Sequence, residues 1–363
     1  MKKTLLPLPP WTLATPILGW LLLAGMGMGL RFGSAYKALL VLGLLAGVLA
    51  AVHHAEVVAH RVGEPFGTLI LAAAVTAIEV ALIVTLMLAG GTATTALARD
   101  TVFSTVMIIL NGIVGLCLLV GGRRFLEQRF ELKGVNASLS TLAAIVVLTL
   151  ILPSFTTSVP GPFYSAKQMG FVAITCLLLY GTFLFIQTVR HRDYFLPQEA
   201  DLGEDVHQPP PSNQVAAVSA VLLVVGLAAV VLLAKAISPL IELGVARIGA
   251  PAALVGIIIS TIVLLPEGLA AVRAARQNRL QTSLNLALGS ALASIGLTIP
   301  AVALVSIFKG WPLAMGLDVK SIILLVLSLF VSILSLGTGR TTILQGVVHL
   351  VIFATYLFMT IFP

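Results

Sequence analysis

Long apolar runs alternate with short polar segments along the whole chain. A helix that spans a bilayer needs about 20 predominantly apolar residues. Runs of this order recur eleven times, at 11–30, 36–58, 68–88, 103–121, 137–153, 166–189, 214–238, 251–274, 281–307, 321–336 and 341–361. The pattern therefore predicts an all-α polytopic membrane protein with about eleven transmembrane helices.

The composition agrees with this interpretation. Of the 363 residues, 59% are hydrophobic and 10% are charged, whereas an ordinary soluble domain has about 25% charged residues. The spans and their short loops account for the chain and leave no room for a separate catalytic domain. Cys117 and Cys176 both lie in apolar runs, which argues against a disulfide framework and against a metal site built on thiolates.

One sizeable hydrophilic segment, residues 190–213, divides the chain. It is poor in apolar residues, which is typical of a flexible linker. A solvated spacer and a cation-collecting or regulatory segment both fit this composition. We expect an N-terminal extra helix at 1–35, a first five-helix repeat at 36–189, this cytoplasmic linker, and a second five-helix repeat at 214–363. The acidic residues of the linker are Asp193, Glu199, Asp201, Glu204 and Asp205, and they are followed by Pro209-Pro210-Pro211.

The basic residues are unevenly distributed between the two sides of the predicted membrane. With a cytoplasmic N-terminus, 13 Lys and Arg residues fall inside and 7 outside, which the positive-inside rule favours. Membrane orientation thus accounts for the net charge of +7 without a nucleic-acid partner. The start Met1-Lys2-Lys3 also fits a signal peptide. However, residues 11–30 are long enough to span, and no clear A-x-A cleavage site precedes Arg31, so a retained first helix is the simpler interpretation.

Two carboxylates, Glu79 and Glu267, lie well inside the apolar runs. A charge at the centre of a spanning helix costs roughly 2.5–3.5 kcal/mol even on the lenient insertion scale, so such residues are functional candidates. A protonated glutamate hydrogen-bonded to a neighbouring helix is the structural alternative. The two residues are 188 positions apart, each in the second helix of a five-helix block. Blocks with an odd number of spans enter the membrane from opposite sides, which is the inverted repeat of secondary transporters, with the site at the midplane.

Polar residues that could supply oxygen ligands accompany each glutamate. Pro266 precedes Glu267 and lacks a backbone donor, so we expect the helix to kink there and to free carbonyl oxygens. Small hydroxyl residues also let helices pack closely, and for each hydroxyl taken singly this alternative is as strong as ligation. The candidates are Thr68 and Thr76 near Glu79, Ser260 near Glu267, Ser104 and Asn111 in the fourth run, and Ser290, Ser294 and Thr298 in the ninth.

A second polar cluster lies at the predicted cytoplasmic end of the second run. His53, Glu56 and His60 are spaced by three and four residues, so they share one helical face, with His54 beside them. The spacing is not that of a metalloprotease motif. Three interpretations stay open: a metal site, a proton-handling or pH-sensing face, and interfacial histidines with no special role.

Two stretches carry a resemblance to a known family. They are Gly63-Glu64-Pro65-Phe66-Gly67-Thr68 leading to Glu79, and Pro266-Glu267 through Gln277-Asn278 to Leu288-Gly289-Ser290. They resemble the two alpha repeats of the cation/proton exchangers of the calcium/cation antiporter superfamily, nearest to the bacterial ChaA type. The resemblance covers about residue 36 to the end and implies one extra helix plus two inverted five-helix repeats.

The sequence departs from the signature of this family in its amides. The signature Gly-Asn-x-x-Glu maps to Val75-Thr76-Ala77-Ile78-Glu79 and to Val263-Leu264-Leu265-Pro266-Glu267, so both glutamates are present and both asparagines are replaced. The Gly-Ser-Ser-x-Gln element is present as Gly289-Ser290-Ala291-Leu292-Ala293, without its Gln. The loss of these amide oxygens argues against strict calcium selectivity.

The resemblance implies that a calcium ion binds between Glu79 and Glu267 and is replaced by protons for the return step. Two nearby carboxylates in a low-dielectric site disfavour joint ionisation unless a cation is bound, so cations and protons compete. Calcium prefers about 6 to 8 oxygen ligands, whereas sodium or potassium needs no more than this site offers. No cofactor beyond the transported ions is implied, and we expect an inner-membrane antiporter most active at alkaline pH.

Two other classes of function explain the sequence less well. An intramembrane enzyme would need a nucleophile with a base, or a complete metal set, and the sequence contains neither. A channel would share the hydrophobicity, but it does not need a pair of carboxylates that alternate between protonated and cation-bound forms. The sequence therefore favours an antiporter over an enzyme, with a cation channel or another membrane protein without proton coupling as the alternative.

Overall fold

The computed structural model describes residues 8–29, 33–63, 66–196, 210–249, 251 and 253–362. The helices of these residues form eleven rods, and each covers most of one of the predicted apolar runs. The helix α1 (Pro10–Gly27) comes first and stands outside the two groups. The first group is α2 (Gly33–Val62), α3 (Phe66–Gly90), the rod of α4 (Leu97–Met107), η2 (Ile108–Ile113) and α5 (Val114–Phe125), the rod of α6 (Leu132–Val146), η3 (Val147–Ile151) and η4 (Leu152–Phe155), and α7 (Ala166–Phe185) with η5 (Ile186–Arg190).

The second group follows the linker. It consists of α8 (Asn213–Arg247), α9 (Ala253–Arg276), α10 (Leu280–Lys309), α11 (Val319–Leu336) and α12 (Ile343–Ile361). Short elements connect the rods: η1 (Gly91–Thr94), η6 (Arg192–Phe195), and an antiparallel pair of strands, β1 (Gln128–Arg129) with β2 (Arg340–Thr341). The all-α fold and the number of helices predicted from the apolar runs are confirmed.

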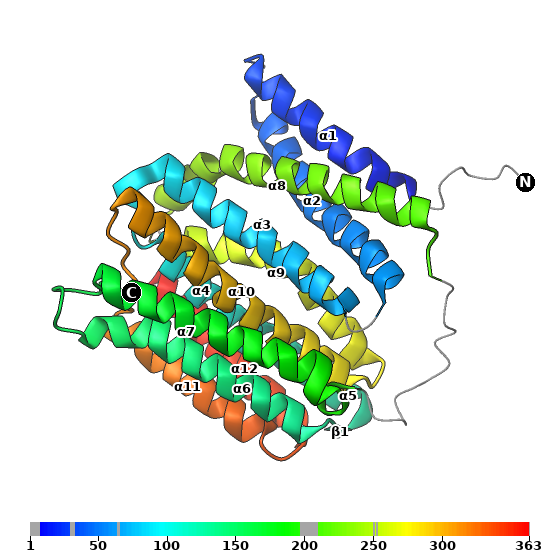
Figure 1. Ribbon diagram of the computed structural model, residues 1–363, viewed down its shortest axis with the longest axis vertical. Helices are drawn as coiled ribbons and strands as arrows, with labels where there is room; N and C mark the ends of the chain where they lie inside the picture. Colours follow the sequence, from blue (N-terminus) through cyan, green and yellow to red (C-terminus); the bar gives the residue numbers. More distant parts are fainter. Residues whose placement is uncertain are drawn as a thin grey trace, which may run out of the picture.

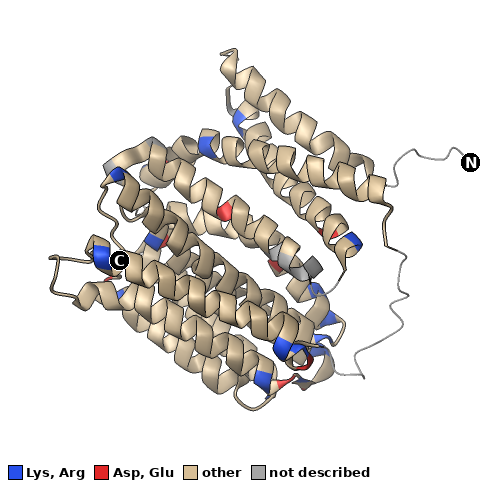
Figure 2. Ribbon diagram, viewed as in Figure 1, with Lys and Arg blue, Asp and Glu red and all other residues tan. Residues whose placement is uncertain are grey.

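Nine helices of the described residues are long and apolar enough to cross a membrane, and α3 contributes the shorter apolar segment Ala73–Leu88. The helix α1 is not among these nine. The chain is thus a multi-pass membrane protein. Most Lys and Arg residues lie at the ends of the rods, and the middles are largely uncharged (Figure 2).

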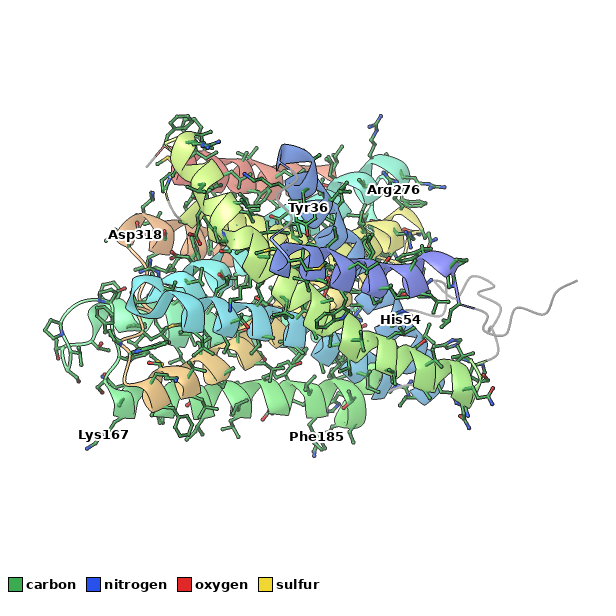
Figure 3. The ribbon with its side chains drawn as sticks, turned by 90° about the horizontal axis from the view of Figure 1, so that it is seen from above. Tyr36, His54, Lys167, Phe185, Arg276 and Asp318 are labelled. Carbon is green, nitrogen blue, oxygen red and sulfur yellow. The ribbon has the colours of Figure 1, made fainter. Side chains whose placement is uncertain are left out.

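The rods run roughly side by side, so the bundle has two ends (Figure 1). Lys167 and Asp318 lie at one end, and Phe185 and Arg276 lie toward the other (Figure 3). We call these the Lys167 end and the Arg276 end. Local caps define where rods begin. Ser165 and Gln168 form a capping box at the start of α7, and the Asp318 side chain accepts the Ser321 N–H at the start of α11, which satisfies donors that the helix leaves open.

Contacts between the two five-helix groups come in matched pairs. The helix α2 packs on its counterpart α8, α3 packs on α10 as α9 packs on α4, and α7 packs on α10 as α12 packs on α5. The two groups are therefore interleaved, and the second helix of each group lies against the third rod of the other. This arrangement brings the two glutamate-bearing helices into the middle of the bundle.

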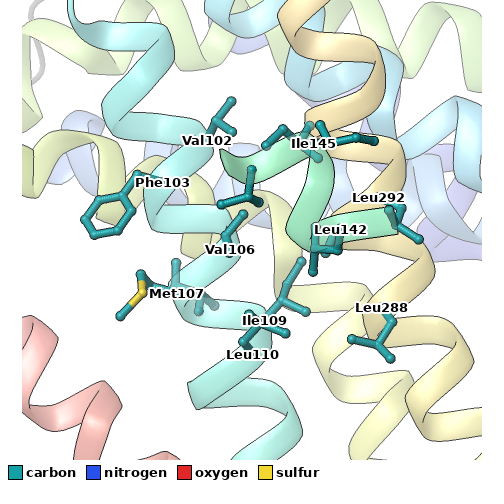
Figure 4. Close-up of a cluster of buried hydrophobic side chains, with 14 of the residues drawn as sticks. Val102, Phe103, Val106, Met107, Ile109, Leu110, Leu142, Ile145, Leu288 and Leu292 are labelled. Atoms are coloured by element: carbon teal, nitrogen blue, oxygen red, sulfur yellow. The ribbon is translucent and has the colours of Figure 1, made fainter. Parts of the chain in front are cut away.

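The rod α4–η2–α5 is the centre of the larger hydrophobic core. Val102, Val106 and Ile109 on this rod pack with Leu142 of α6 and Leu292 of α10 (Figure 4). A smaller core joins α2, α3, α8 and α9. In the middle of the central rod, η2 is one wider π-helical turn, a feature that often marks functional regions of a helix. The apolar pattern did not predict it.

Candidate cation site

Glu79 is held by hydroxyl groups from two other helices. Its side chain, on α3, is 4% exposed. Its Oε1 accepts a hydrogen bond from Ser294 Oγ of α10 at 2.6 Å and one from Thr105 Oγ1 of α4 at 3.3 Å. Both hydroxyl residues are buried. The packing of α3 on α10 and α4 thus creates a polar site for the carboxylate in an otherwise apolar core.

A third hydroxyl extends this network to α9. Thr105 Oγ1 also lies 3.3 Å from Ser260 Oγ, and Ser260 donates to the Thr101 carbonyl at 3.1 Å. Because Thr105 has a single hydroxyl proton, it can donate either to Glu79 or to Ser260, but not to both at once. The network therefore links α3, α4, α9 and α10, and it contains one donor that can switch its acceptor.

Glu267 has different surroundings. It lies on α9, which continues as one helix through Pro266, so the expected kink does not break the helix. The proline still leaves the carbonyl four residues earlier without its usual helical donor. The buried Oε2 of Glu267 has no hydrogen-bond partner among the described residues.

A cavity of about 420 Å³ reaches from Glu267 to the Arg276 end. It passes between α2, α3, α7, α9 and α10, and Glu79 is not part of its wall. It comes to the surface beside Glu56 and Arg192, which are both exposed. Its polar lining residues are Glu56, Thr76, Gln187, Thr188, Arg192, Glu267, Arg279, Thr282, Asn285 and Ser290.

The Lys167 end of the bundle contains a buried connection. The buried segment Leu313–Leu317 crosses it between α10 and α11. Backbone hydrogen bonds join this segment to the Thr95 and Leu150 carbonyls at 3.1 and 2.9 Å. Arg99, which pairs with Asp100 at 2.8 Å, also donates to the Gly316 carbonyl at 3.1 Å. The cavity thus opens toward the Arg276 end, and the segment at the Lys167 end is held by hydrogen bonds to neighbouring loops and helix ends.

The sequence profile described as "Sodium/calcium exchanger protein" matches residues 33–189 and 218–362 of this chain. The chain belongs to this family. The family lies within the calcium/cation antiporter superfamily, so the resemblance found in the sequence is confirmed, and the exchanger is a transporter rather than an enzyme.

Relatives of known description align over nearly the whole exchanger. The y4hA protein of Sinorhizobium fredii is 47% identical over 357 residues, covering 98% of this chain and 97% of its own length. The sodium-potassium/proton antiporter ChaA of Escherichia coli is 38% identical over 344 residues, covering 94% and 93%. The solved structure of the Ca²⁺/H⁺ antiporter protein YfkE superposes with a TM-score of 0.72 at 18% identity, covering 97% of this chain and 98% of that one. This likeness shows that the fold is shared.

The structure brings together most of the ligand candidates predicted from the exchanger's sequence. Ser294 binds Glu79, and Thr76, Ser290 and Pro266 line the cavity that contains Glu267. The side chain of Thr68 lies outside the described residues. Ser260 joins the hydroxyl network, whereas the hydroxyl of Thr298 is buried without a hydrogen-bond partner among the described residues.

Asn111 and Ser104 lie elsewhere. The Asn111 amide donates to Ser328 Oγ of α11 at 2.8 Å, and its oxygen lies 3.3 Å from His349 Nδ1 of α12. Ser104 donates to the Asp100 carbonyl of its own helix. The expectation that Asn111 joins the glutamates is therefore corrected. The wider turn η2 changes the helical register between positions 104 and 111, and the face carrying Asn111 points to α11 and α12.

The histidine cluster is only partly assembled. His53 Nδ1 and Glu56 Oε2 lie 3.9 Å apart, His54 Nε2 lies 3.1 Å from the Thr12 carbonyl, and His60 is exposed. No group of three or more His, Cys, Asp or Glu residues in the described parts of the chain could hold a metal ion. Glu56 is the member of this cluster that reaches the cavity.

Sequence reasoning missed Thr105, and it missed Arg192, Arg279 and Asn285 at the cavity mouth. Thr105 directly follows Ser104, and the hydroxyl that faces Glu79 is the next one along the helix. One feature of the sequence could have pointed to Thr105. It lies four residues after Thr101, so the two hydroxyls share one face of the helix. The mouth residues come from the ends of separate helices, so no spacing in the sequence joins them.

Proposed function

We propose that the protein is a secondary active antiporter that exchanges cytoplasmic cations for external protons at Glu79 and Glu267. The observation that carries this proposal is a pair of carboxylates from matching positions of the two halves: Glu79 accepts a hydrogen bond from Ser294 of α10, and Glu267 lies on the wall of a cavity that Ser290 of the same helix also lines. A carboxylate held by hydroxyl donors and a carboxyl with an unpartnered oxygen together suit a site that takes up either a cation or protons.

The oxygen set suits a hard cation. Ser294 donates its proton to Glu79, Thr105 can do the same, and both keep lone pairs on their oxygens, so these hydroxyls can contact a cation beside the carboxylate. Thr76, Ser290 and the carbonyl freed by Pro266 add further oxygens on the cavity side. With water from the cavity, this set reaches the coordination of a sodium, potassium or calcium ion.

Two observations support inverted repeats at 36–189 and 214–363. The family profile matches the chain as two segments, 33–189 and 218–362, and the contacts between the two groups of helices are matched pair by pair. Each half of an inverted repeat offers the same elements to opposite sides of the membrane, so one half can close a path while the other opens it. The helix at 1–35 and the linker at 190–213 stand outside this symmetry.

The ion choice we propose is broader than calcium. Thr76 and Leu264 replace the two signature asparagines, so the site has fewer neutral amide oxygens for a divalent ion, and sodium and potassium become competitive. The Escherichia coli relative, at 38% identity, is described as a sodium-potassium/proton antiporter, which supports this choice. Exchange should be strongest at alkaline pH, where protons compete least.

The orientation we propose places the Arg276 end in the cytoplasm of a bacterial inner membrane. The linker and the excess of basic residues both belong to that side in the orientation favoured by the positive-inside rule. The open cavity then faces the cytoplasm, and the segment Leu313–Leu317 closes the external side.

Proton movement in sealed vesicles tests the proposed function. A pH gradient should dissipate when sodium, potassium or calcium is added, and Glu79→Gln or Glu267→Gln should abolish this while the protein still inserts in the membrane. Each substitution keeps the size of the side chain and removes its charge. Near-normal exchange by either variant would contradict the site, and cation conduction without proton movement would instead indicate a channel.

A further inference from the structure

The two glutamates of the site are matched by a second pair of carboxylates, one on the first helix of each half. Glu56 lies six residues before the end of α2, and Glu242 lies five residues before the end of α8. The next helix carries Glu79 thirteen residues after its start in the first half and Glu267 fourteen residues after its start in the second. Glu56 and Glu242 thus lie in similar places, near the ends of the first helices of the two groups.

Each helix that bears Glu56 or Glu242 packs against the helix that bears the site glutamate of the other half. The helix α2, which bears Glu56, packs on α9, which bears Glu267, and α8, which bears Glu242, packs on α3, which bears Glu79. Glu56 and Glu267 line the same cavity, one at its surface end and one at its base. The same relation should hold between Glu242 and Glu79 when the other end is open.

The surroundings of both carboxylates suit a charge that acts in water. The side chain of Glu56 is 55% exposed, and its near charges are His53 at 3.9 Å, Arg273 of α9, and Arg192 and Arg279 across the cavity. Glu242 is also exposed, and its Oε1 accepts a hydrogen bond from the buried Ser238 at 2.9 Å. This hydrogen bond orients the carboxylate without neutralising it.

A basic residue at the cavity mouth makes the negative charge of Glu56 more important for attracting cations. Arg192 lines the mouth through which a cation must pass, and its positive charge repels the cation. Glu56 is the one acidic residue on the wall of the cavity outside the site, among the residues that the structure describes. A negative charge at a low-dielectric mouth raises the local concentration of cations.

We propose that Glu56 and Glu242 are mouth carboxylates that recruit inorganic cations, Glu56 at the Arg276 end and Glu242 at the Lys167 end. The inference rests on the proposed exchange function and on the inverted relation of the two halves. Glu56 acts in the conformation described above, and Glu242 acts in the conformation in which the opposite end is open. Neither residue needs to contact the cation in the central site.

The test is the half-saturating cation concentration measured separately from each side. Purified protein is reconstituted, its orientation is determined, and exchange is started by adding sodium or calcium to one side. Glu56→Gln should raise the half-saturating concentration only at the Arg276 end, and Glu242→Gln only at the Lys167 end. Because the attraction scales with the charge of the ion, a threefold change for sodium should become about ninefold for calcium. Both changes should shrink in high concentrations of inert salt.

Two further sets of variants keep the proposal falsifiable. Glu56→Lys and Glu242→Lys should enlarge the effects on the same sides. Glu127→Gln is the matched control, because Glu127 is an exposed carboxylate at the Arg276 end that pairs with Arg129 and Arg340 away from the cavity, and it should change neither side.

The outcomes separate the two proposals. If a change at either residue affects both sides equally, or neither side, or sodium as strongly as calcium, the recruitment role is wrong. If the parent protein shows no cation-dependent proton movement at all, the proposed function fails first.

Discussion

Glu79 and Glu267 occupy matching positions in the two halves, yet their surroundings differ. Glu79 is enclosed and accepts hydrogen bonds from Ser294 and Thr105, whereas Glu267 lines the cavity and has one oxygen without a partner in the described part of the chain. Two halves related by an inverted repeat cannot have equal surroundings while only one end is open. The different surroundings of the two glutamates therefore depend on the conformation of the protein as much as on the neighbouring residues.

The hydroxyls around Glu79 should dominate cation binding. Ser294→Ala removes the 2.6 Å donor to the carboxylate. A hydrogen bond to a charged group is worth about 1.5–3 kcal/mol, so the half-saturating cation concentration should rise roughly 10- to 100-fold. Ser290→Ala, one turn earlier on the same helix and facing the cavity, is the matched control and should change it only a few-fold. Equal effects of the two substitutions would remove the distinction between the two surroundings.

The open and closed ends can be compared by chemical labelling. In a background without Cys117 and Cys176, Leu286→Cys places a thiol on the wall of the cavity and Ala314→Cys places one in the covering segment. An impermeant thiol reagent should modify the first from the Arg276 end and leave the second unreactive. Reaction of the Ala314→Cys variant from the Lys167 end would mean that this end is open in the membrane.

Topology follows from the same experiment. Lys309→Cys should react in intact cells, and Glu204→Cys should be protected, if the N-terminus is cytoplasmic. The reverse pattern would overturn the proposed orientation without affecting the site.

The missing amide oxygens should have a smaller effect, which is on the preference of the site for calcium over sodium. Leu264→Asn restores one signature oxygen near Glu267 and should tighten calcium binding several-fold relative to sodium, since one hydrogen-bonding or ligand group is worth about 1 kcal/mol. The measurement is exchange against each cation from about pH 6.5 to 9, a range that includes alkaline conditions. Leu264 is 2% exposed and lies in the core, so Thr76→Asn on the matching helix serves as a second variant. A parent that ignores sodium and potassium, or unchanged calcium binding in both variants, would refute the argument.

The linker should have the smallest effect. Deleting Glu199 to Asp205 removes four of its acids but none of the site residues, so the maximal exchange rate should stay of the same order while cation dependence or regulation changes. Complete loss of exchange in a correctly inserted deletion would show that the segment belongs to the transport mechanism.

Much of the fold and part of the site could be predicted before the structure. The eleven helices follow from apolar runs because backbone polar groups in a membrane must be satisfied within a helix. The glutamates stand out because an intramembrane carboxylate is costly. The helical faces were less predictable: Asn111 was assigned to the glutamates, but the wider turn η2 places it against Ser328 and His349. Thr105 was overlooked because its partner lies on a helix that the sequence does not place beside it.

The sequence by itself determined the membrane class, the number of helices, the duplicated glutamates and the likeness to cation exchangers, because each depends on local composition or on spacing along one chain. Only the tertiary structure decided which hydroxyls reach Glu79, that Glu267 faces the cavity, that Arg192 and Arg279 line its mouth, and which end is closed. These features depend on how helices from the two halves cross and pack. Side chains far apart in sequence meet there, and the conformation, rather than the composition, determines which of them water can reach.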